Sequence, residues 1–286
     1  MSNQTSGALK KFVDVAKKET RVLGSVERYI ISKPKDKSRR TDVLHPSEMV
    51  GNDWCHRASY FQLQGKEPIN NRTMTLGLDN VFEEGHAIHA KWQKRFQNMN
   101  NLHGMWYCHE CEETFWGGTD CHDGPITYRE VPLFYEPLRI AGHSDGWLKG
   151  FGEDLMLEIK SIGEGTLRWE CPELYAENNY DFKATWKAIT TPFMKHVMQV
   201  QIYMKLAELL SEADPRFIGY PKEAVLIYEN KADQSVKEFV VPKGDFGIKH
   251  IFEAAQLIVD SIKAQTPPEC NVTMGGCTKC KGYENG

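Results

Sequence analysis

Two carboxylates and a lysine stand out in the stretch Ala141–Ser161, which reads AGHSDGWLKGFGEDLMLEIKS. Apolar and polar residues alternate around Asp145 and again in the second half of the stretch, and a glycine-rich turn separates the two runs, so the pattern predicts a hairpin. Because side chains two positions apart in a strand point to the same side, Glu158 and Lys160 share a face and Ile159 points into the core. The hairpin would bring Asp145 near Glu158.

Carboxylate oxygens are the ligands that Mg²⁺ and Mn²⁺ prefer, and such an ion polarises a phosphate and lowers the pKa of a bound water. Lys160 beside them would position that water, help to deprotonate it, or neutralise charge that develops on the phosphorus. The alternative is that Asp145 lies in a turn and that Glu158 and Lys160 form an ion pair on a solvated face. Other parts of the chain must decide between the two interpretations.

A helix is predicted over residues 79–97, where apolar residues recur at three- and four-residue spacing. Gly85 and His89 are one turn apart and therefore lie on the same face. A glycine there leaves room for a metal ion or a phosphate to approach the imidazole. The alternative for His89 is a surface or hydrogen-bonded core histidine.

A second helix is predicted over residues 193–211, and it carries His196, Gln199 and Tyr203 along one face. A polar stripe on an otherwise apolar helix is expected to face something polar. In this chain that would be the cleft of the predicted divalent-metal site and its substrate. The alternative is that the polar side chains of the stripe form a buried amide–hydroxyl hydrogen bond.

The remaining pattern predicts an α/β chain. Strands are expected at 129–135, 138–148, 154–161, 223–229 and 235–241, and a last helix at 245–264. Between them, residues 162–192 form a long insert with several aromatic side chains, which either pack together or stack on the bases of single-stranded DNA.

Residues 103–127 have no clear period and are rich in Gly, Cys, His and Trp. Cys108 and Cys111 form a CxxC knuckle that Cys121 follows, so three thiolates and one further group would complete a tetrahedral Zn²⁺ site. The candidates for the fourth ligand are His122, which we favour, His109, His103 and Asp123. The alternative is a loop with free cysteines.

The C-terminal segment PPECNVTMGGCTKCKGYENG contains Cys270, Cys277 and Cys280 in glycine-rich coil with little apolar matter. Such a segment needs a metal centre to become ordered, and Cys55 is the unpaired candidate for a fourth ligand. Four cysteines satisfy either Zn²⁺ or an iron–sulfur cluster.

Composition excludes several classes of protein. The 286 residues are 41% hydrophobic and 26% charged with a net charge of −4, which is typical of a soluble globular chain without a global basic field. No apolar run approaches the length of a membrane span, and the first residues lack the apolar core of a signal peptide. We therefore expect a cytoplasmic protein that does not enter membranes. Of its eight cysteines, seven fall into two sets that are expected to bind metal rather than form disulfides, and Cys171 is left over as a plain thiol.

The motifs occur in the order Gly85-x3-His89, Asp145, Glu158-x-Lys160 and Gln199-x3-Tyr203. This order resembles the PD-(D/E)xK nuclease superfamily and, within it, the RecB-like exonucleases, over about residues 45–286. The Gln-x3-Tyr motif in particular is similar to that branch. One cysteine before the core and three after it resemble the iron–sulfur nucleases of CRISPR adaptation and the AddB-type helicase-nuclease subunits, and the Cys-rich insert resembles an elaboration of phage-encoded exonucleases.

The resemblance implies a restriction-endonuclease-like fold, which is a mixed central sheet flanked by helices, with a metal-clamped tail at 265–286. The Cys/His-rich metal-binding insert at 103–127 is an addition that is not part of the common core of the family. The resemblance implies that residues 45–286 are the nuclease domain and 1–44 a helical, basic extension. It also assigns roles to individual residues. The divalent-metal ligands would be His89, Asp145, Glu158 and the carbonyl of Ile159. Lys160 would be the catalytic lysine, and Gln199 and Tyr203 would organise the site. A [4Fe–4S] cluster would bind Cys55, Cys270, Cys277 and Cys280.

The function implied is a Mg²⁺- or Mn²⁺-dependent deoxyribonuclease that acts as an exonuclease on DNA with a free end or on single strands, in recombination, repair or end processing. One alternative is a CRISPR-adaptation nuclease that trims spacer precursors with protein partners, which would use the same active site and be distinguished by genomic neighbourhood. A non-catalytic DNA-binding scaffold subunit is the alternative from another class. It would be expected to lack Asp145, Glu158 or Lys160, and all three are present.

Overall fold

A computed structural model of the chain describes residues 22–34, 39–68, 74–118, 124–245, 247–272 and 277–284. The candidate zinc ligands Cys121, His122 and Asp123, and residues 1–21 and 35–38 of the predicted extension, lie outside these ranges. The helices are α2 (Leu23–Ser32), α3 (Pro46–Met49), α4 (His56–Leu63), α5 (Leu76–Asn98), η1 (Glu136–Leu138), α6 (Glu164–Glu170), α7 (Pro172–Glu177), α8 (Phe182–Ala188), α9 (Met194–Leu210), η2 (Pro215–Phe217), α10 (Lys249–Lys263) and α11 (Thr278–Glu284). The strands are β1 (Leu102–Cys108), β2 (Thr114–Gly117), β3 (Ile126–Tyr128), β4 (Val131–Tyr135), β5 (Ile140–Ser144), β6 (Gly146–Leu148), β7 (Leu155–Ile162), β8 (Glu223–Asn230) and β9 (Val236–Pro242).

The chain divides into two compact units. The first consists of Met1–Lys37 with Arg72–Glu83, and the second of Ser38–Asn71 with Glu84–Gly286. In the first unit, Lys33 of the segment after α2 pairs with Asp79 in the first turn of α5, with 3.3 Å between Nζ and Oδ1. The features described below belong to the second unit.

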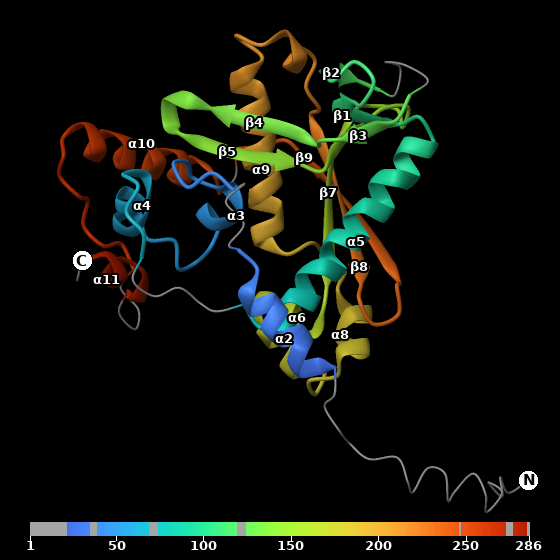
Figure 1. Cartoon of the computed structure of the whole chain (residues 1–286), viewed down its shortest axis with the longest axis horizontal. Coiled ribbons are helices and arrows are strands. Elements are labelled where there is room, and N and C mark those ends of the chain that lie inside the picture. The colour runs from blue at the N-terminus through green and yellow to red at the C-terminus, as the bar shows by residue number, and fades with distance from the viewer. Residues whose placement is uncertain are drawn as a thin grey trace, which may run out of the picture. The chain divides into compact units, whose positions relative to one another are not determined.

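A seven-stranded sheet forms the centre of the second unit, in the order β2-β1-β6-β7-β8-β9 with β3 paired to β1 (Figure 1). β7 and β8 are parallel, and the other pairs in this sheet are antiparallel. Parallel strands need a long crossover connection, and the segment with α6, α7, α8 and α9 supplies it. β4 and β5 pair in a separate two-stranded sheet. The predicted architecture, a mixed central sheet flanked by helices, is confirmed.

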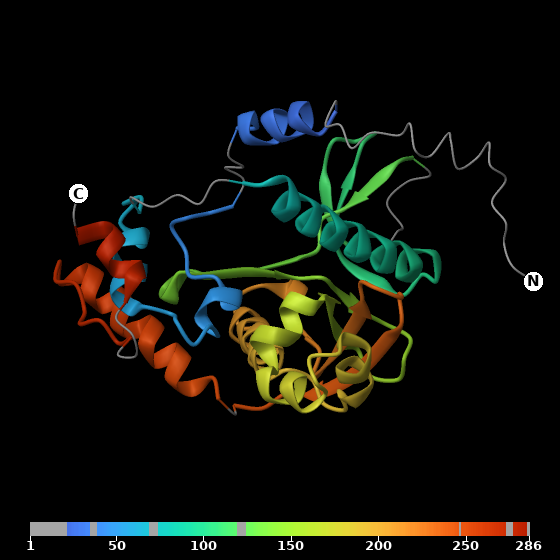
Figure 2. The ribbon, with the colours of Figure 1, turned by 90° about the horizontal axis from the view of Figure 1, so that it is seen from below.

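The two faces of the sheet bury different side chains because successive residues of a strand point to opposite sides. On one face, Leu157 and Ile159 of β7 pack with Ile88 of α5. On the other, Met156 and Ile162 of β7 pack with the apolar side chains of α9. Figures 1 and 2 show α5 and α9 on opposite sides of β7. Glu158 and Lys160 therefore belong to the α9 side.

Two sequence-based expectations about strands were wrong. The single strand expected at 138–148 is divided at Asp145 into β5, which pairs with β4, and β6, which pairs with β7. Residues 103–127 were expected to lack regular structure, but β1 lies there and joins the central sheet. Its residues alternate between buried and half-buried from Leu102 to Cys108, and this two-residue period was hidden because Gly, Trp and Cys occupy the buried positions.

The aromatic insert at 162–192 folds into α6, α7 and α8, where Tyr175 and Trp186 are buried. Trp169 and Tyr180 are instead exposed, by 82% and 68%. Within the described ranges, none of the helices combines the length and the apolarity that crossing a lipid bilayer requires.

Candidate active site

β7 brings Glu158 and Lys160 together on the α9 side of the sheet. Their side chains are two residues apart, and Lys160 Nζ lies 2.7 Å from Glu158 Oε1. Glu158 is buried at 4% exposure. The pair is therefore not an ion pair on a solvated face, which was the alternative interpretation of the motif.

α9 holds Lys160 through a chain of hydrogen bonds. Lys160 Nζ donates to Gln199 Oε1 at 2.9 Å, and Gln199 Nε2 donates to Tyr203 OH at 2.9 Å. Gln199 and Tyr203 are one helical turn apart, so they lie on the same face, and both are buried. The Gln-x3-Tyr motif thus connects α9 to the lysine of β7.

His196, the third member of the predicted polar stripe, has a different partner. Its Nδ1 lies 2.6 Å from the hydroxyl of Tyr228 on β8. Burial, together with the positive charges of Lys160 and Lys195, lowers the pKa of His196 to about 2. The neutral imidazole therefore accepts a hydrogen bond from the Tyr228 hydroxyl, which fastens α9 to the sheet.

Asp145 lies at the break between β5 and β6, where its carboxylate reaches two other elements. Oδ1 lies 2.9 Å from His89 Nδ1 of α5, and Oδ2 accepts a hydrogen bond from the Ile159 N–H at 2.5 Å. Burial lowers the pKa of His89, but the hydrogen bond and charge of Asp145 outweigh this, so the net pKa is raised. Asp145 thus ties α5 to β7 beside Glu158.

The second carboxylate oxygen of Glu158 has no partner. Oε2 is fully buried, and no hydrogen bond reaches it from the described part of the chain. Burial raises the pKa of Glu158, the charge of Lys160 opposes this, and the charge of Asp145 adds to the rise. An unpartnered buried oxygen costs free energy, and a bound cation would satisfy it.

Gly85 precedes His89 by one turn and faces β7. A Cβ at this position would lie 3.5 Å from the Ser161 Oγ, which is ordinary van der Waals contact. Contact with Ser161 therefore does not require a glycine at position 85. This contact does not explain the space that was predicted beside the imidazole.

A cavity of about 610 Å³ adjoins these residues and is lined by Tyr203, Glu130, Arg39, Arg40 and three histidines, among others. Gly142 in its wall allows the close approach of Tyr203, because a Cβ there would lie 2.8 Å from the tyrosine Cε1. A cavity of this volume is within the range of small-ligand pockets. Its lining contains imidazole groups and two guanidinium groups, of which Arg39 pairs with Glu48 and Arg40 with Asp42.

Glu130 and Gln93 are two residues of this site that the sequence did not single out. Burial and the charge of Asp145 raise the pKa of Glu130 to about 7, and Gln93 Nε2 donates a hydrogen bond to the main-chain oxygen of Asp145 at 3.1 Å. Nothing in the local pattern distinguishes Glu130 from a surface residue before a strand. Gln93 lies one turn after His89, and that spacing was the only available signal.

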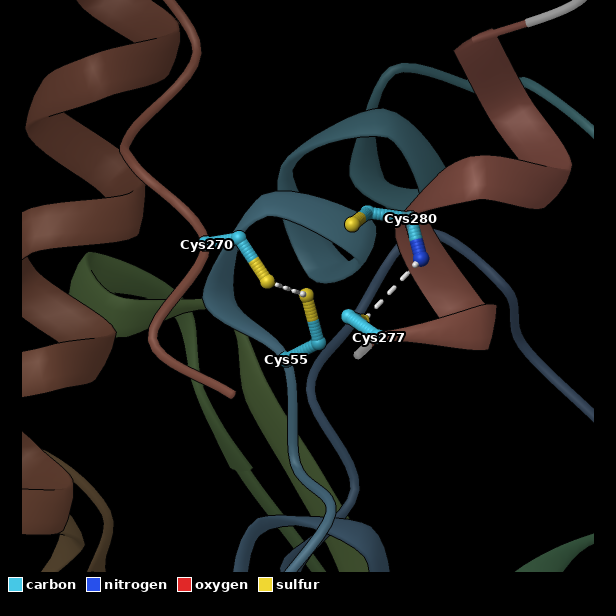
Figure 3. A group of neighbouring side chains, drawn as sticks. All are labelled: Cys55, Cys270, Cys277 and Cys280. Atoms are coloured by element: carbon cyan, nitrogen blue, oxygen red, sulfur yellow. Dashed lines mark hydrogen bonds between the residues drawn. The ribbon is translucent and has the colours of Figure 1, made fainter. Parts of the chain in front are cut away.

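Cys55 and the three cysteines of the C-terminal segment lie together, as predicted. Cys55, Cys270, Cys277 and Cys280 place their sulfurs within 4.8 Å of one another (Figure 3). No other such group of three or more Cys, His, Asp or Glu side chains is found in the described ranges. The His89, Asp145 and Glu158 side chains are therefore less compactly arranged than the cysteines.

Hydrogen bonds around the cysteine cluster fix the tail against α4. Cys55 caps the start of α4, where its sulfur accepts from the Ala58 N–H at 3.4 Å. Asn271 accepts from the His56 N–H at 2.8 Å and donates to the Trp54 carbonyl at 2.9 Å. The cluster could hold a metal ion, and it joins two segments that are far apart in the sequence.

The spacing of these sulfurs bears on the kind of metal centre. A single zinc ion, with Zn–S bonds of about 2.3 Å, holds four thiolates within about 4 Å of one another. Each thiolate of a [4Fe–4S] cluster binds a different iron, so a cluster holds them farther apart. The Cys55 and Cys270 sulfurs are 3.8 Å apart, which is close to the spacing around a single ion.

The candidate zinc site of the insert is only partly described. Cys108 is buried at the end of β1, and Cys111 is exposed in the turn that follows. Of the competing ligands, His109 Nε2 lies 2.7 Å from Thr127 Oγ1, and the His103 ring contacts Trp116 edge-on. Since Cys121 and His122 lie outside the described residues, the zinc site stays a prediction. Cys171, left over from both sets, is half-buried and donates to the Leu167 carbonyl.

No protein-family model and no curated protein matches the chain. Among solved structures, the alkaline exonuclease LHK-Exo from Laribacter hongkongensis is 14% identical with a TM-score of 0.43, covering 79% of this chain and 90% of that one. Its complex with dAMP gives 12% identity, a TM-score of 0.44 and the same coverage. The protein SSO0001 is 13% identical with a TM-score of 0.37, covering 89% of this chain and 86% of that one. At such distances, the function proposed below depends on the side chains of this chain.

Proposed function

We propose that the chain is a divalent-metal-dependent DNA exonuclease of the PD-(D/E)xK superfamily, in the RecB-like branch. The observation that carries the proposal is the buried Glu158 carboxylate, which leaves one oxygen without a partner beside Asp145. Lys160 is held next to it by Gln199 and Tyr203. A purely structural ion pair would not need a buried oxygen left without a hydrogen bond.

The donor set fits a divalent cation. His89, Asp145, Glu158 and the carbonyl of Ile159 are the proposed ligands, and the imidazole among them makes Mn²⁺ as suitable as Mg²⁺. When bound, the ion would polarise the scissile phosphate and lower the pKa of a water. The residues of the chain hold their own positions beforehand, because Asp145 is fixed by the Ile159 N–H and by His89.

Lys160 is the proposed catalytic lysine. Its side chain is 20% exposed, and its ammonium group has two partners, Glu158 and Gln199, which aim it along the α9 side of β7. From there it would orient the attacking water or stabilise charge on the phosphate. Gln199 and Tyr203 would affect the substrate in two ways. They hold this lysine in place, and Tyr203 also lines the cavity.

The proposed substrate is DNA with a free end or a single strand, processed during recombination, repair or the maturation of DNA ends. The adjoining cavity has Arg39, Arg40 and three histidines in its lining, and a terminal phosphate would replace Glu48 and Asp42 as the partner of the two arginines. We also propose that residues 45–286 form the nuclease domain and that 1–44 is an extension.

The purified protein is expected to shorten linear DNA when Mg²⁺ or Mn²⁺ is present and to stop when the ion is chelated. End-labelled single- and double-stranded substrates, each labelled at the 5′ or the 3′ end, would report both strand preference and polarity. A closed circular duplex serves as the control, since an exonuclease needs an end. Binding of DNA without cleavage under all these conditions would favour the scaffold alternative instead.

We further propose that the four-cysteine cluster holds a [4Fe–4S] cluster, as the sequence resemblance implies. Zn²⁺ is the second candidate, because the 3.8 Å between the Cys55 and Cys270 sulfurs suits a single ion. Either centre would clamp the tail to α4 and have no contact with the reacting phosphate.

The insert is proposed to bind one Zn²⁺ through Cys108, Cys111, Cys121 and His122. Elemental analysis of the purified protein is expected to show zinc that is lost in a Cys108→Ser/Cys111→Ser variant, because two of the four ligands are removed. A Cys171→Ser variant, which changes a cysteine outside both sets, should keep its zinc. Unchanged zinc in the double variant would contradict this site.

A further inference from the structure

α5 contacts Asp145 with two side chains that lie one turn apart on the same face. His89 reaches the carboxylate, with 2.9 Å between Nδ1 and Oδ1. Gln93 reaches the main chain instead, where its Nε2 donates to the Asp145 carbonyl at 3.1 Å. The side chain and the backbone of Asp145 are thus held separately by one helix.

Gln93 is held in turn by Glu130. Its Nε2 lies 3.4 Å from Glu130 Oε1, so the two protons of one amide nitrogen serve Glu130 and the Asp145 carbonyl. Both acceptors face the amide nitrogen, so Glu130 and the Asp145 carbonyl together set the orientation of the Gln93 amide. Without Glu130 the amide keeps only its hydrogen bond to the Asp145 carbonyl and is free to swing about it.

The position of Glu130 is unusual for its residue type. Its backbone adopts a φ of +60°, in the left-handed region that a residue with a Cβ rarely occupies. Its carbonyl accepts a hydrogen bond from the Met105 N–H of β1 at 2.8 Å. This backbone conformation directs the side chain toward Gln93 and into the lining of the cavity that Tyr203 shares.

We propose that Gln93 and Glu130 form a positioning pair that fixes the main chain at the break between β5 and β6, and so sets the direction of the Asp145 carboxylate. The need arises from the fold, because Asp145 lies between strands of two different sheets and no strand pairing holds it. The inference rests on the proposed function in taking Asp145 as a metal ligand. Gln93 is outside the lining of the cavity proposed for the terminal nucleotide, whereas Glu130 also belongs to that lining, so Gln93→Ala is the variant that isolates the positioning role.

The test compares Gln93→Ala, Glu130→Ala and the double variant with the unaltered chain. Partners that orient a metal ligand typically change metal affinity or activity by about 10- to 100-fold when removed. Each single variant is therefore expected to lower kcat and to weaken Mn²⁺ binding, measured by calorimetry, by about 10-fold or more. In Gln93→Ala, whose side chain is outside the cavity lining, KM for DNA should change less than about 3-fold. Glu130→Gln keeps an oxygen acceptor and should recover most of the loss.

The double variant distinguishes a positioning role of Gln93 and Glu130 from a general loss of stability. Because both residues act through the same hydrogen bonds, the double variant should lose no more than either single variant. Glu112→Ala is the matched control, since Glu112 is also a glutamate with a left-handed backbone, φ +56°, but is exposed in the turn after β1. Its kcat and Mn²⁺ affinity should equal those of the unaltered chain.

Additive losses in the double variant, or a lowered unfolding temperature with unchanged Mn²⁺ affinity, would overturn the positioning role. A chain that binds Mn²⁺ through Asp145 but cleaves no DNA would reject the proposed function alone, and the pair would still be supported if its variants weaken that binding. A chain that neither cleaves DNA nor binds Mn²⁺ would reject both.

Discussion

Asp145→Asn, Glu158→Gln and Lys160→Met are each expected to reduce DNA cleavage by about 100-fold or more, the scale of one lost electrostatic contact to a transition state. Each change keeps the size of the side chain and removes its charge. Asp145 and Glu158 are buried, and Lys160 contacts Glu158 at 2.7 Å, so the three charges serve one small region of the molecule. Initial rates on end-labelled DNA with saturating Mn²⁺ would measure the loss.

The stability of the folded chain is not expected to fall together with its activity when Glu158 is changed. Its pKa is raised in the folded chain, so the ionised carboxylate opposes folding as the pH rises above its unfolded pKa and through the folded value. Glu158→Gln removes that cost and should not lower the unfolding temperature of the metal-free protein at pH 8. An inactive variant that is as stable as the original chain is typical of a functional residue.

Glu153→Gln provides the control for this experiment. Glu153 belongs to the exposed turn that connects β6 to β7, so the same substitution is made in the same hairpin outside the site. Its cleavage rate should be unchanged. If Asp145→Asn or Glu158→Gln cleaved DNA as fast as Glu153→Gln does, the assigned active site would be wrong.

Cys55→Ser and Cys277→Ser are expected to remove the metal of the four-cysteine cluster and to lower the unfolding temperature by on the order of 10 °C, which is about 3–5 kcal/mol for a domain of this size. The reason is that metal–thiolate bonds supply folding free energy to a segment with little apolar surface. They join α4 to a tail 215 positions later in the sequence. Thermal unfolding and elemental analysis on the same samples would measure both effects.

The colour of the purified protein distinguishes the two candidate metal centres of the four-cysteine cluster. A [4Fe–4S] cluster would make the anaerobically purified protein brown and give a broad visible absorbance, and both would be absent from the variants. A colourless protein whose zinc falls by one ion per chain in Cys55→Ser would assign Zn²⁺ to the cluster. Cys171→Ser should behave like the unaltered chain, since Cys171 is outside the cluster. A protein with no metal at these cysteines would show that packing alone orders the tail.

Local periodicity was enough to predict several relations in the site. The two-residue period of β7 placed Glu158 and Lys160 on one side, and the 3.6-residue period of α9 placed Gln199 and Tyr203 on one face. The structure joins both pairs by direct contacts. The meeting of four cysteines was also predictable, because a tail with so few apolar residues has little else to offset its ordering entropy.

Other parts of the site depend on contacts between distant residues. Asp145 lies at a break because β5 pairs with β4 while β6 pairs with β7, and no feature of the local sequence determines which partner each strand finds. Gln93 and Glu130 are ordinary polar residues of a helix and of a strand boundary. They join the site only because α5 packs against the sheet and Glu130 adopts a left-handed backbone.

The sequence by itself therefore determined which residues share a face within one element, since that follows from the geometry of a helix or a strand. It also determined the mixed α/β class through the order of those elements. The tertiary structure alone decided the partners of Asp145, the strand within the Cys-rich segment and the unpartnered oxygen of Glu158. Strand pairing and burial arise from many weak contacts between residues far apart in the chain, and a local pattern does not contain them.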